Sequence, residues 1–487
     1  MTALGPLALV PAVLLAVGGG GVFREAAAAD CRLGELGEAE ILAITRAPPE
    51  RPLADPSHYA PRLAKRAADA VLNGGECAGN TRFRYGAGLG DVTGPAWDQE
   101  LAGYVDRHQL SEGIHIRQFA RAFAFQSTCG GRTGRAMIVN VDQGLMFHSI
   151  RQGVLDRIAA DETDRLGAQY AAANLLISAT HSHATAVGQD HHDGSNVFAG
   201  GHDEQSYEAM VAGIVTAIRR AHRNLVRAPE ASIRIARGEV LNTQVQRSAP
   251  AYARNPEIER RRYLDVDGRE VTTNRMMTLL KLERDDGTPV AMLNWFGVHG
   301  TSMAQTNKLL SGDNKGYAEL RFEQDFATDY FADETFVGGF LQADEGDNSP
   351  NLFITDLSER ELRDLEGEKF RTRGGGRDDF ESTLVSGAKQ YVAARELYRS
   401  ANERLRGEVA GGFYHIDFTR VEVEHPRPHP TELMPRDGAR QRTCKPALGV
   451  SFAAGAEDGR GPTEEGQACP EGGRAFLAGV REAFSAI

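Results

Sequence analysis

The sequence predicts an α/β protein in which mixed, layered β-sheets are flanked by helices. Short apolar or alternating runs, typical of strands, lie next to segments with apolar residues at helical spacing, and this succession occurs twice before residue 299. Two of the strand-like runs also lead directly into loops that carry histidines. Such loops are expected where the edge of a sheet assembles a functional site.

The individual elements follow from these patterns. Strands are expected where apolar and polar residues alternate, or where a short apolar run is bounded by turn residues, at 114–125, 136–141, 336–342 and 413–423. Helices are expected at 152–166, 207–225, 380–405 and 474–487. The glycine-rich segment 83–94 lacks the full dinucleotide-binding fingerprint, and no strand–turn–helix unit follows it, which argues against a Rossmann fold.

The first 80 residues are expected to lie outside the main domain. Residues 1–29 combine an apolar run, interrupted by Pro and Gly, with a small-residue end at 26–29, which predicts an export signal and a periplasmic or extracellular protein. No Lys or Arg precedes the apolar run, so a start without signal function stays open as a second interpretation. Residues 30–80 are expected to form an N-terminal extension and residues 81–487 the main domain.

Composition excludes several classes of function. The chain has 487 residues, 41% of them hydrophobic and 25% charged, as in an ordinary globular protein. Its net charge of −12 argues against a nucleic-acid partner, because a duplex-binding protein needs a basic face. The five cysteines show no Cys-x-x-Cys spacing, which argues against a zinc ribbon and a thioredoxin-like site.

Three histidines are the candidate metal ligands. His181 and His183 follow an apolar run and are one residue apart, so on extended backbone both side chains project from the same face. His299 follows a second apolar run in a similar Gly/Thr/Ser loop. Imidazole is a frequent zinc ligand, and the strand-end argument alone makes His183 a third ligand. Ordinary loop polarity and hydrogen bonding stay open as the alternative for the His-x-His pair.

Several further motifs occur in an order that resembles one known family. They include Thr180-His181-Ser182-His183 and Gly346-Asp347-Asn348-Ser349-Pro350-Asn351, together with the segments 90–95, 113–123, 246–256, 294–299, 311–318 and 443–455. Together these motifs resemble the neutral (non-lysosomal) ceramidases, zinc amidases that split ceramide into sphingosine and a fatty acid.

The resemblance implies roles for five residues. His181 and His299 are the zinc ligands (Zn²⁺ being the cofactor), whereas His183 and Arg247 lie beside the metal, hold the substrate and polarise its amide carbonyl. Ser349 falls on a serine that the family needs for activity and is expected to contact the sphingoid hydroxyl. The implied substrate is ceramide or a related sphingolipid, met transiently at a membrane surface or micelle.

The resemblance also implies parts that are expected beyond residue 487. Family members continue with a zinc-binding Glu, a zinc-binding Tyr and an immunoglobulin-like domain, so the fold is expected to be truncated at its C-terminus. A catalytic zinc usually has three protein ligands. An incomplete or non-catalytic lipid-binding subunit that needs a separate chain for the missing ligands is therefore the alternative hypothesis. A metal-binding protein without amidase activity is a third.

Each candidate residue also has a simpler interpretation. Arg247 would form an ion pair with Glu257 or Glu259, and Ser349 would order the turn before Pro350. Asp313 and Asp347 are expected to be hydrogen-bond acceptors that order their loops. His191 and His192 belong to a polar loop, with a role as substitute ligand as the alternative.

Overall fold

The computed structural model describes most of the chain after residue 80. The main described ranges are 81–104, 106–129, 131–192, 199–264, 268–352 and 376–417. The structure also describes residues 196, 374, 419, 421–423, 441–442, 455–456 and 459–460. The predicted export signal (1–29), N-terminal extension (30–80) and last helix (474–487) lie outside the described residues.

Two central sheets form the described fold. In the first sheet the strand order is β1 (Phe83–Asp91), β4 (Phe119–Cys129), β5 (Arg132–Val141) and β6 (Leu175–Ala179). In the second it is β12 (Val337–Leu341), β10 (Pro289–Trp295), β9 (Met276–Glu283), β7 (Ile233–Glu239) and β14 (Glu403–Arg404). Pairing is antiparallel except for β5–β6 and β10–β12. Both sheets are therefore mixed, as predicted.

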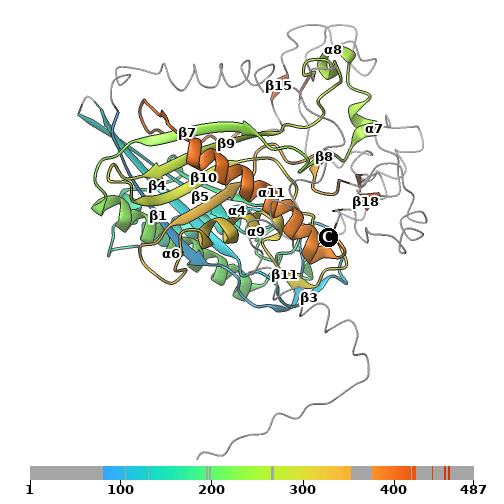
Figure 1. Ribbon diagram of the computed structural model, residues 1–487. Helices are drawn as coiled ribbons and strands as arrows, with labels where there is room; N and C mark the ends of the chain where they lie inside the picture. Colours follow the sequence, from blue (N-terminus) through green and yellow to red (C-terminus); the bar gives the residue numbers. More distant parts are fainter. Residues whose placement is uncertain are drawn as a thin grey trace, which may run out of the picture.

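Helices cover the outer face of each sheet, which gives four layers (Figure 1). One buried cluster joins the first sheet to α4 (His148–Ala159) and α6 (Glu204–Arg227), and another joins the second sheet to α9 (Asp313–Gln324) and α11 (Asp379–Ser400). A third cluster lies between the two sheets. The layered α/β class predicted from the sequence is confirmed.

Strand β4 shows how the sequence builds these layers. Its side chains alternate between the two faces of the sheet, as in any strand. Ala120, Ala122 and Ala124 belong to the cluster under the helices. Phe119, Phe123 and Phe125 belong to the cluster between the sheets. The small residues let the helices approach closely, whereas the aromatic rings fill the space between the sheets.

The glycine-rich segment that argued against a Rossmann fold is strand β1, which the sequence did not predict. Glycine has a low β-propensity, so a glycine-rich run does not predict a strand. Its glycines allow α6 to pack directly on the strand, and a Cβ on Gly86 would lie 2.2 Å from the Leu225 backbone nitrogen. The glycines are thus explained by a helix more than 120 residues away in the sequence.

Shorter elements complete the described part. They are β2 (Trp97–Glu100), β3 (Leu110–Ile114), β8 (Val245–Gln246), α7 (Ala249–Tyr252), α8 (Glu257–Arg260), β11 (Leu309–Leu310), β13 (Asn348–Ser349), β15 (Glu422–Val423), β16 (Gln441–Arg442), β17 (Gly455–Ala456), β18 (Gly459–Arg460) and the 3₁₀ turn Leu166–Ala168. Strands β11, β3 and β2 form a small sheet, and β13 pairs with β8.

Some element boundaries differ from those predicted. The strand expected at 114–125 is interrupted, since β3 ends at Ile114 and β4 begins at Phe119. Helix α4 ends at Ala159, where the Asp161 side chain accepts the Asp164 amide and turns the chain. The strand expected at 413–423 is wrong over residues 413–417, which form no strand. The elements at 136–141 and 207–225 are confirmed within β5 and α6, and the strand expected at 336–342 is confirmed as β12, which is one residue shorter at each end.

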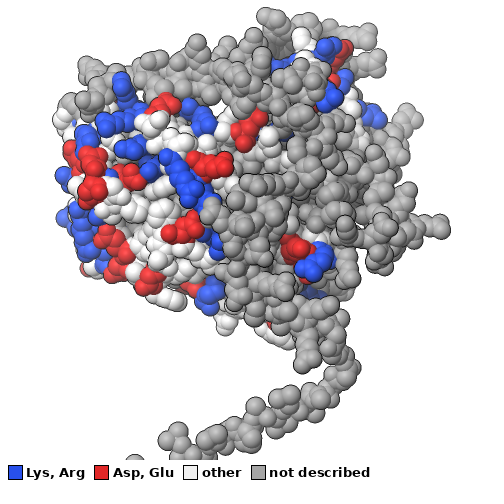
Figure 2. Space-filling view, viewed as in Figure 1, with Lys and Arg blue, Asp and Glu red and all other residues white. Residues whose placement is uncertain are grey.

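Acidic and basic side chains alternate on the described surface that Figure 2 shows. Among the described helices, none combines the length and the hydropathy needed to cross a lipid bilayer.

Candidate metal centre

The two sheets meet where β6 and β10 end, and their loops carry the candidate histidines. Ser182 and Gly300 form a parallel bridge between the loops, and the His183 amide donates to the Gly300 carbonyl at 2.9 Å. A Cβ on Gly300 would lie 2.2 Å from the His181 carbonyl oxygen, so only glycine allows this approach. His181 itself has left-handed backbone (φ 64°). The pairing brings together histidines 118 positions apart in the sequence.

Gln342 holds the same junction from the end of β12. Its side-chain amide nitrogen donates to the Thr180 carbonyl at 2.8 Å and also to the Val298 carbonyl. Its amide oxygen accepts the Val298 amide at 3.1 Å. One side chain thus binds the backbone just before His181 and just before His299. Gln342 is not among the predicted site residues, and its signal in the sequence is that of a polar residue directly after an apolar strand.

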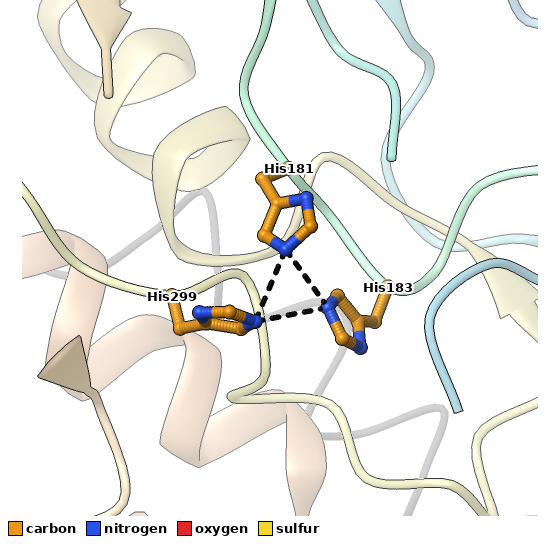
Figure 3. A group of neighbouring side chains, drawn as sticks. All are labelled: His181, His183 and His299. Carbon is orange, nitrogen blue, oxygen red and sulfur yellow. Dashed lines mark hydrogen bonds between the residues drawn. The ribbon is translucent and has the colours of Figure 1, made fainter. Parts of the chain in front are cut away.

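The three imidazoles of the histidine cluster (His181, His183 and His299) converge (Figure 3). The Nε2 atoms of His181 and His299 are 3.1 Å apart, those of His183 and His299 are 3.1 Å apart, and those of His181 and His183 are 3.3 Å apart. Two nitrogens bound to one tetrahedral zinc at about 2.0–2.1 Å lie about 3.4 Å apart. Among the described residues, only this group brings three possible ligand atoms of His, Cys, Asp or Glu within 4.8 Å of one another.

Backbone carbonyls distinguish two of these histidines from the third. His181 Nδ1 lies 2.7 Å from the Gly144 carbonyl, and His299 Nδ1 lies 3.2 Å from the Glu345 carbonyl. A carbonyl only accepts, so both Nδ1 atoms carry the proton and both Nε2 atoms present lone pairs. The buried Nδ1 of His183 has no hydrogen-bond partner among the described residues, so no backbone carbonyl fixes the tautomer of this imidazole.

The surroundings keep two of the imidazoles, His183 and His299, neutral. Burial, followed by the charges of Arg247 and His181, lowers the pKa of His299 to about 2. Burial also lowers the pKa of His183 well below its ordinary value, with contributions from His299, His181 and Arg247. Neutral imidazoles whose lone pairs face one another repel until a cation lies between them. The donor set therefore fits a metal ion, and its nitrogens suit zinc.

The β8–β13 ribbon brings Arg247 and Ser349 to this centre. Asn348 pairs with Gln246, and Ser349 pairs with Val245. The Arg247 amide donates to the Asp347 carbonyl at 2.9 Å, while the His299 amide donates to the Asn348 carbonyl at 2.7 Å. The hexapeptide 346–351 thus binds both Arg247 and the loop of His299. The charge of Arg247 contributes to the lowered pKa of His183 and of His299.

The simpler interpretations have mixed outcomes. Ser349 is fully buried, and its hydroxyl accepts the Asn351 amide at 3.0 Å, as expected of a serine that orders a turn. Glu257 and Glu259, proposed as partners of Arg247, instead form ion pairs with Arg261 and Arg262.

The loop residues follow the predictions made for them. Asp313 accepts the amides of Ser302 and Met303 at 3.2 and 3.0 Å, and Asp347 accepts the Gln246 side-chain amide at 2.6 Å, so both order their loops. His191 packs against His202 and Tyr207, away from the histidine cluster.

Comparison with known proteins decides the family. The family model described as neutral/alkaline non-lysosomal ceramidase, N-terminal, matches residues 83–486. The chain belongs to this family. The neutral ceramidase family includes neutral ceramidase B of Dictyostelium discoideum, which is 33% identical over 395 residues, or 79% of this chain and 52% of that protein. Neutral ceramidase of Pseudomonas aeruginosa is 32% identical over 399 residues, or 82% of this chain and 52% of that protein.

Solved ceramidase structures share the fold. A structure described as ceramidase complexed with C2 matches with a TM-score of 0.63 and 32% identity, over 82% of this chain and 55% of that chain. The crystal structure of neutral ceramidase from Pseudomonas aeruginosa matches with a TM-score of 0.61 and 30% identity, over 77% of this chain and 52% of that chain. The chain spans about half the length of the ceramidases that it matches.

Proposed function

We propose that this chain carries the zinc-binding part of a ceramidase that hydrolyses the amide bond of ceramide to sphingosine and a fatty acid. One observation carries the proposal. His181 and His299, delivered by different sheets, point unprotonated Nε2 atoms at each other at 3.1 Å, and each donates its Nδ1 proton to a backbone carbonyl. Metal-binding histidines usually show this second hydrogen bond, because it fixes the ring and its tautomer.

His181 and His299 would hold the zinc ion. When bound, zinc lowers the pKa of a coordinated water to about 7 and acts as a Lewis acid. Those are the two requirements of amide hydrolysis, a nucleophile at neutral pH and relief of the charge that builds on the carbonyl oxygen. The further ligands that the family implies would complete the coordination.

His183 would act as the general base and acid. Its Nε2 lies 3.1 and 3.3 Å from the two proposed ligand nitrogens, so it borders the place where the amide must react. Its lowered pKa leaves it neutral at pH 7 and able to accept a proton. Arg247 would hold the substrate carbonyl and stabilise the negative charge that develops on its oxygen. Ser349, buried in the β8–β13 ribbon, would contact the sphingoid hydroxyl.

The test is zinc content and turnover in the same preparation. Purified chain is dialysed against zinc, the bound metal is measured by elemental analysis, and fatty-acid release from a short-chain ceramide is followed. About one zinc per chain with turnover, both lost in His299→Ala, is the expected result. His148→Ala is the matched control, because His148 is an exposed histidine at the start of α4. Zinc-free wild-type chain without turnover contradicts the proposal and favours a subunit that needs a separate chain.

A further inference from the structure

We infer that Asn314 and Lys315, buried in the first turn of α9, are positioning residues that hold the loop of His299 and its carbonyl acceptor in place for the metal. The inference rests on the proposed function, because it assigns these residues to the metal centre proposed above. Both lie in the segment 311–318, a motif to which the proposed mechanism gives no role.

Asn314 holds the loop of His299 directly. It is fully buried, and its side-chain nitrogen donates to the His299 carbonyl at 2.9 Å and to the Ser302 hydroxyl at 3.1 Å. Its side-chain oxygen accepts the Gln390 amide at 3.0 Å, which ties it to α11. The carbonyl of a proposed metal ligand is thus fixed to two helices.

Lys315 holds the two strand ends that lead to the site. Its ammonium donates to the Phe296 carbonyl at 2.7 Å and to the Leu341 carbonyl at 3.3 Å. These carbonyls lie just beyond β10 and at the end of β12, which are parallel neighbours. One loop continues to His299, and the other continues to Glu345, whose carbonyl receives the His299 Nδ1 proton. Lys315 therefore sets the separation between the histidine and the group that fixes its tautomer.

The chemistry of the contact argues against simple packing. Lys315 is 1% exposed and its described hydrogen bonds are to neutral carbonyls, although burial of an ammonium costs free energy that an apolar side chain would avoid. An apolar residue of similar length would fill the same space between α9 and the second sheet. What it would lack is the ability to bind two carbonyls from separate strands at once.

Lys389 on α11 provides a matched control. It is also buried, 7% exposed, and its ammonium donates to a backbone carbonyl, that of Asn242 at 2.6 Å. Its contact lies on the loop after β7, not on the loops of His299 or Glu345. Replacing either lysine removes a buried amino group from the same helical layer, but of the two only Lys315 contacts the strand ends that lead to His299.

The experiment compares Lys315→Met, Asn314→Leu and Lys389→Met in the full chain. Zinc affinity is measured by competition with a chromogenic chelator, and amide hydrogen exchange of residues 296–303 is measured in the metal-free protein. We expect the first two variants to bind zinc about 10 to 100-fold more weakly, the range seen when an outer hydrogen-bond partner of a metal ligand is lost. Exchange at 296–303 should accelerate in the same two variants, whereas Lys389→Met should match the wild type in both measurements.

The other outcomes are also decisive. Unchanged zinc affinity and exchange in Lys315→Met and Asn314→Leu overturn the inference, as does an equal loss in all three variants, which would show general destabilisation. If the wild-type chain binds no zinc, the proposed function is wrong. The positioning role of Asn314 and Lys315 is then tested by the hydrogen exchange of residues 296–303 alone. If Lys315→Met and Asn314→Leu do not fold, Asn314→Asp takes their place. This variant keeps the size and the acceptor of the side chain but loses its amide donors, so weaker zinc binding and faster exchange are again expected. Lys315→Arg should retain the zinc affinity of the wild type.

Discussion

Two groups of buried polar side chains join the sheets of this protein, and they differ in how their charges and lone pairs are satisfied. The histidine cluster brings three imidazoles together with two unprotonated nitrogens 3.1 Å apart. The Arg121 cluster consists of Arg121 on β4, Asp142 after β5, and Glu319 and Glu323 on α9, all at most 2% exposed.

Each carboxylate of the Arg121 cluster has donors from within the protein. Arg121 donates to both carboxylate oxygens of Glu323 at 2.9 and 3.1 Å and to Asp142 at 2.9 Å, and it lies 2.7 Å from Glu319. Backbone amides of β12 donate to Glu319 and Glu323 at 2.9 and 3.2 Å. Such a group links the sheets and needs no ligand.

The difference separates a structural polar cluster from a site. In the Arg121 cluster a charged donor contacts each of the three carboxylates, as buried ions require. In the histidine cluster backbone carbonyls accept the Nδ1 protons of His181 and His299, which turns their Nε2 lone pairs toward one another. A buried group whose acceptors converge without donors is expected to bind a cation, and the predictions below test that distinction.

The largest effect is expected from His183→Ala, which removes the proposed proton carrier without removing a proposed zinc ligand. Turnover of a short-chain ceramide should fall about 10² to 10⁴-fold, the usual contribution of a general acid–base group. Zinc content should stay at the wild-type value, since His181 and His299 keep their carbonyl-bound Nδ1 protons. Loss of zinc together with turnover would instead make His183 the third ligand, as the strand-end argument alone suggested.

The next effect is expected from Arg121→Met, which leaves three buried carboxylates without their cation. Removing one partner of a buried ion pair costs about 3–5 kcal/mol, because the remaining charge is uncompensated. Urea denaturation measures the loss in the free energy of unfolding. Arg132→Met is the control, because the Arg132 side chain is 74% exposed and its loss should change stability by at most about 0.5 kcal/mol. A loss of less than about 1 kcal/mol for Arg121→Met would show that the cluster is not structural.

The sequence predicted the histidine cluster because its signal is local. Each of the two apolar runs ends next to a histidine, and the rule that strand ends meet at a sheet edge needs no knowledge of the partner. Helix α6 was predicted within a few residues for the same reason, since its apolar spacing lies within one continuous segment.

What the sequence did not reveal depends on partners far away in the chain. Arg121 occupies one position of an alternating strand, and nothing near it indicates carboxylates about 200 residues later. Gln342, Asn314 and Lys315 bind backbone carbonyls, and the local sequence does not indicate which carbonyls these are. The run 413–423 alternates as a strand should, but over residues 413–417 it has no ladder partner among the described residues.

The effect of Glu319→Gln is expected in the pH dependence of stability, and it is absent at low pH. One arginine faces three carboxylates, and burial together with the charge of Asp142, opposed by Arg121, raises the pKa of Glu319 well above its ordinary value of 4.5. The folded protein therefore keeps a proton that the unfolded chain releases as pH rises above 4.5. The wild type should lose stability as pH rises from there through the folded pKa, by up to about 1.4 kcal/mol per pH unit for one proton.

Glu319→Gln cannot titrate at this position, so its stability relative to the wild type should increase as pH rises from 5 to 8. The pKa values of Asp313 and Asp379 are raised by burial to about 6, and their contributions, which have the same sign, occur in both proteins and cancel in the difference. Urea denaturation of the two proteins at several pH values gives this difference directly. A difference that stays constant with pH would show that Glu319 is ionised in the folded protein and that the Arg121 cluster holds no extra proton.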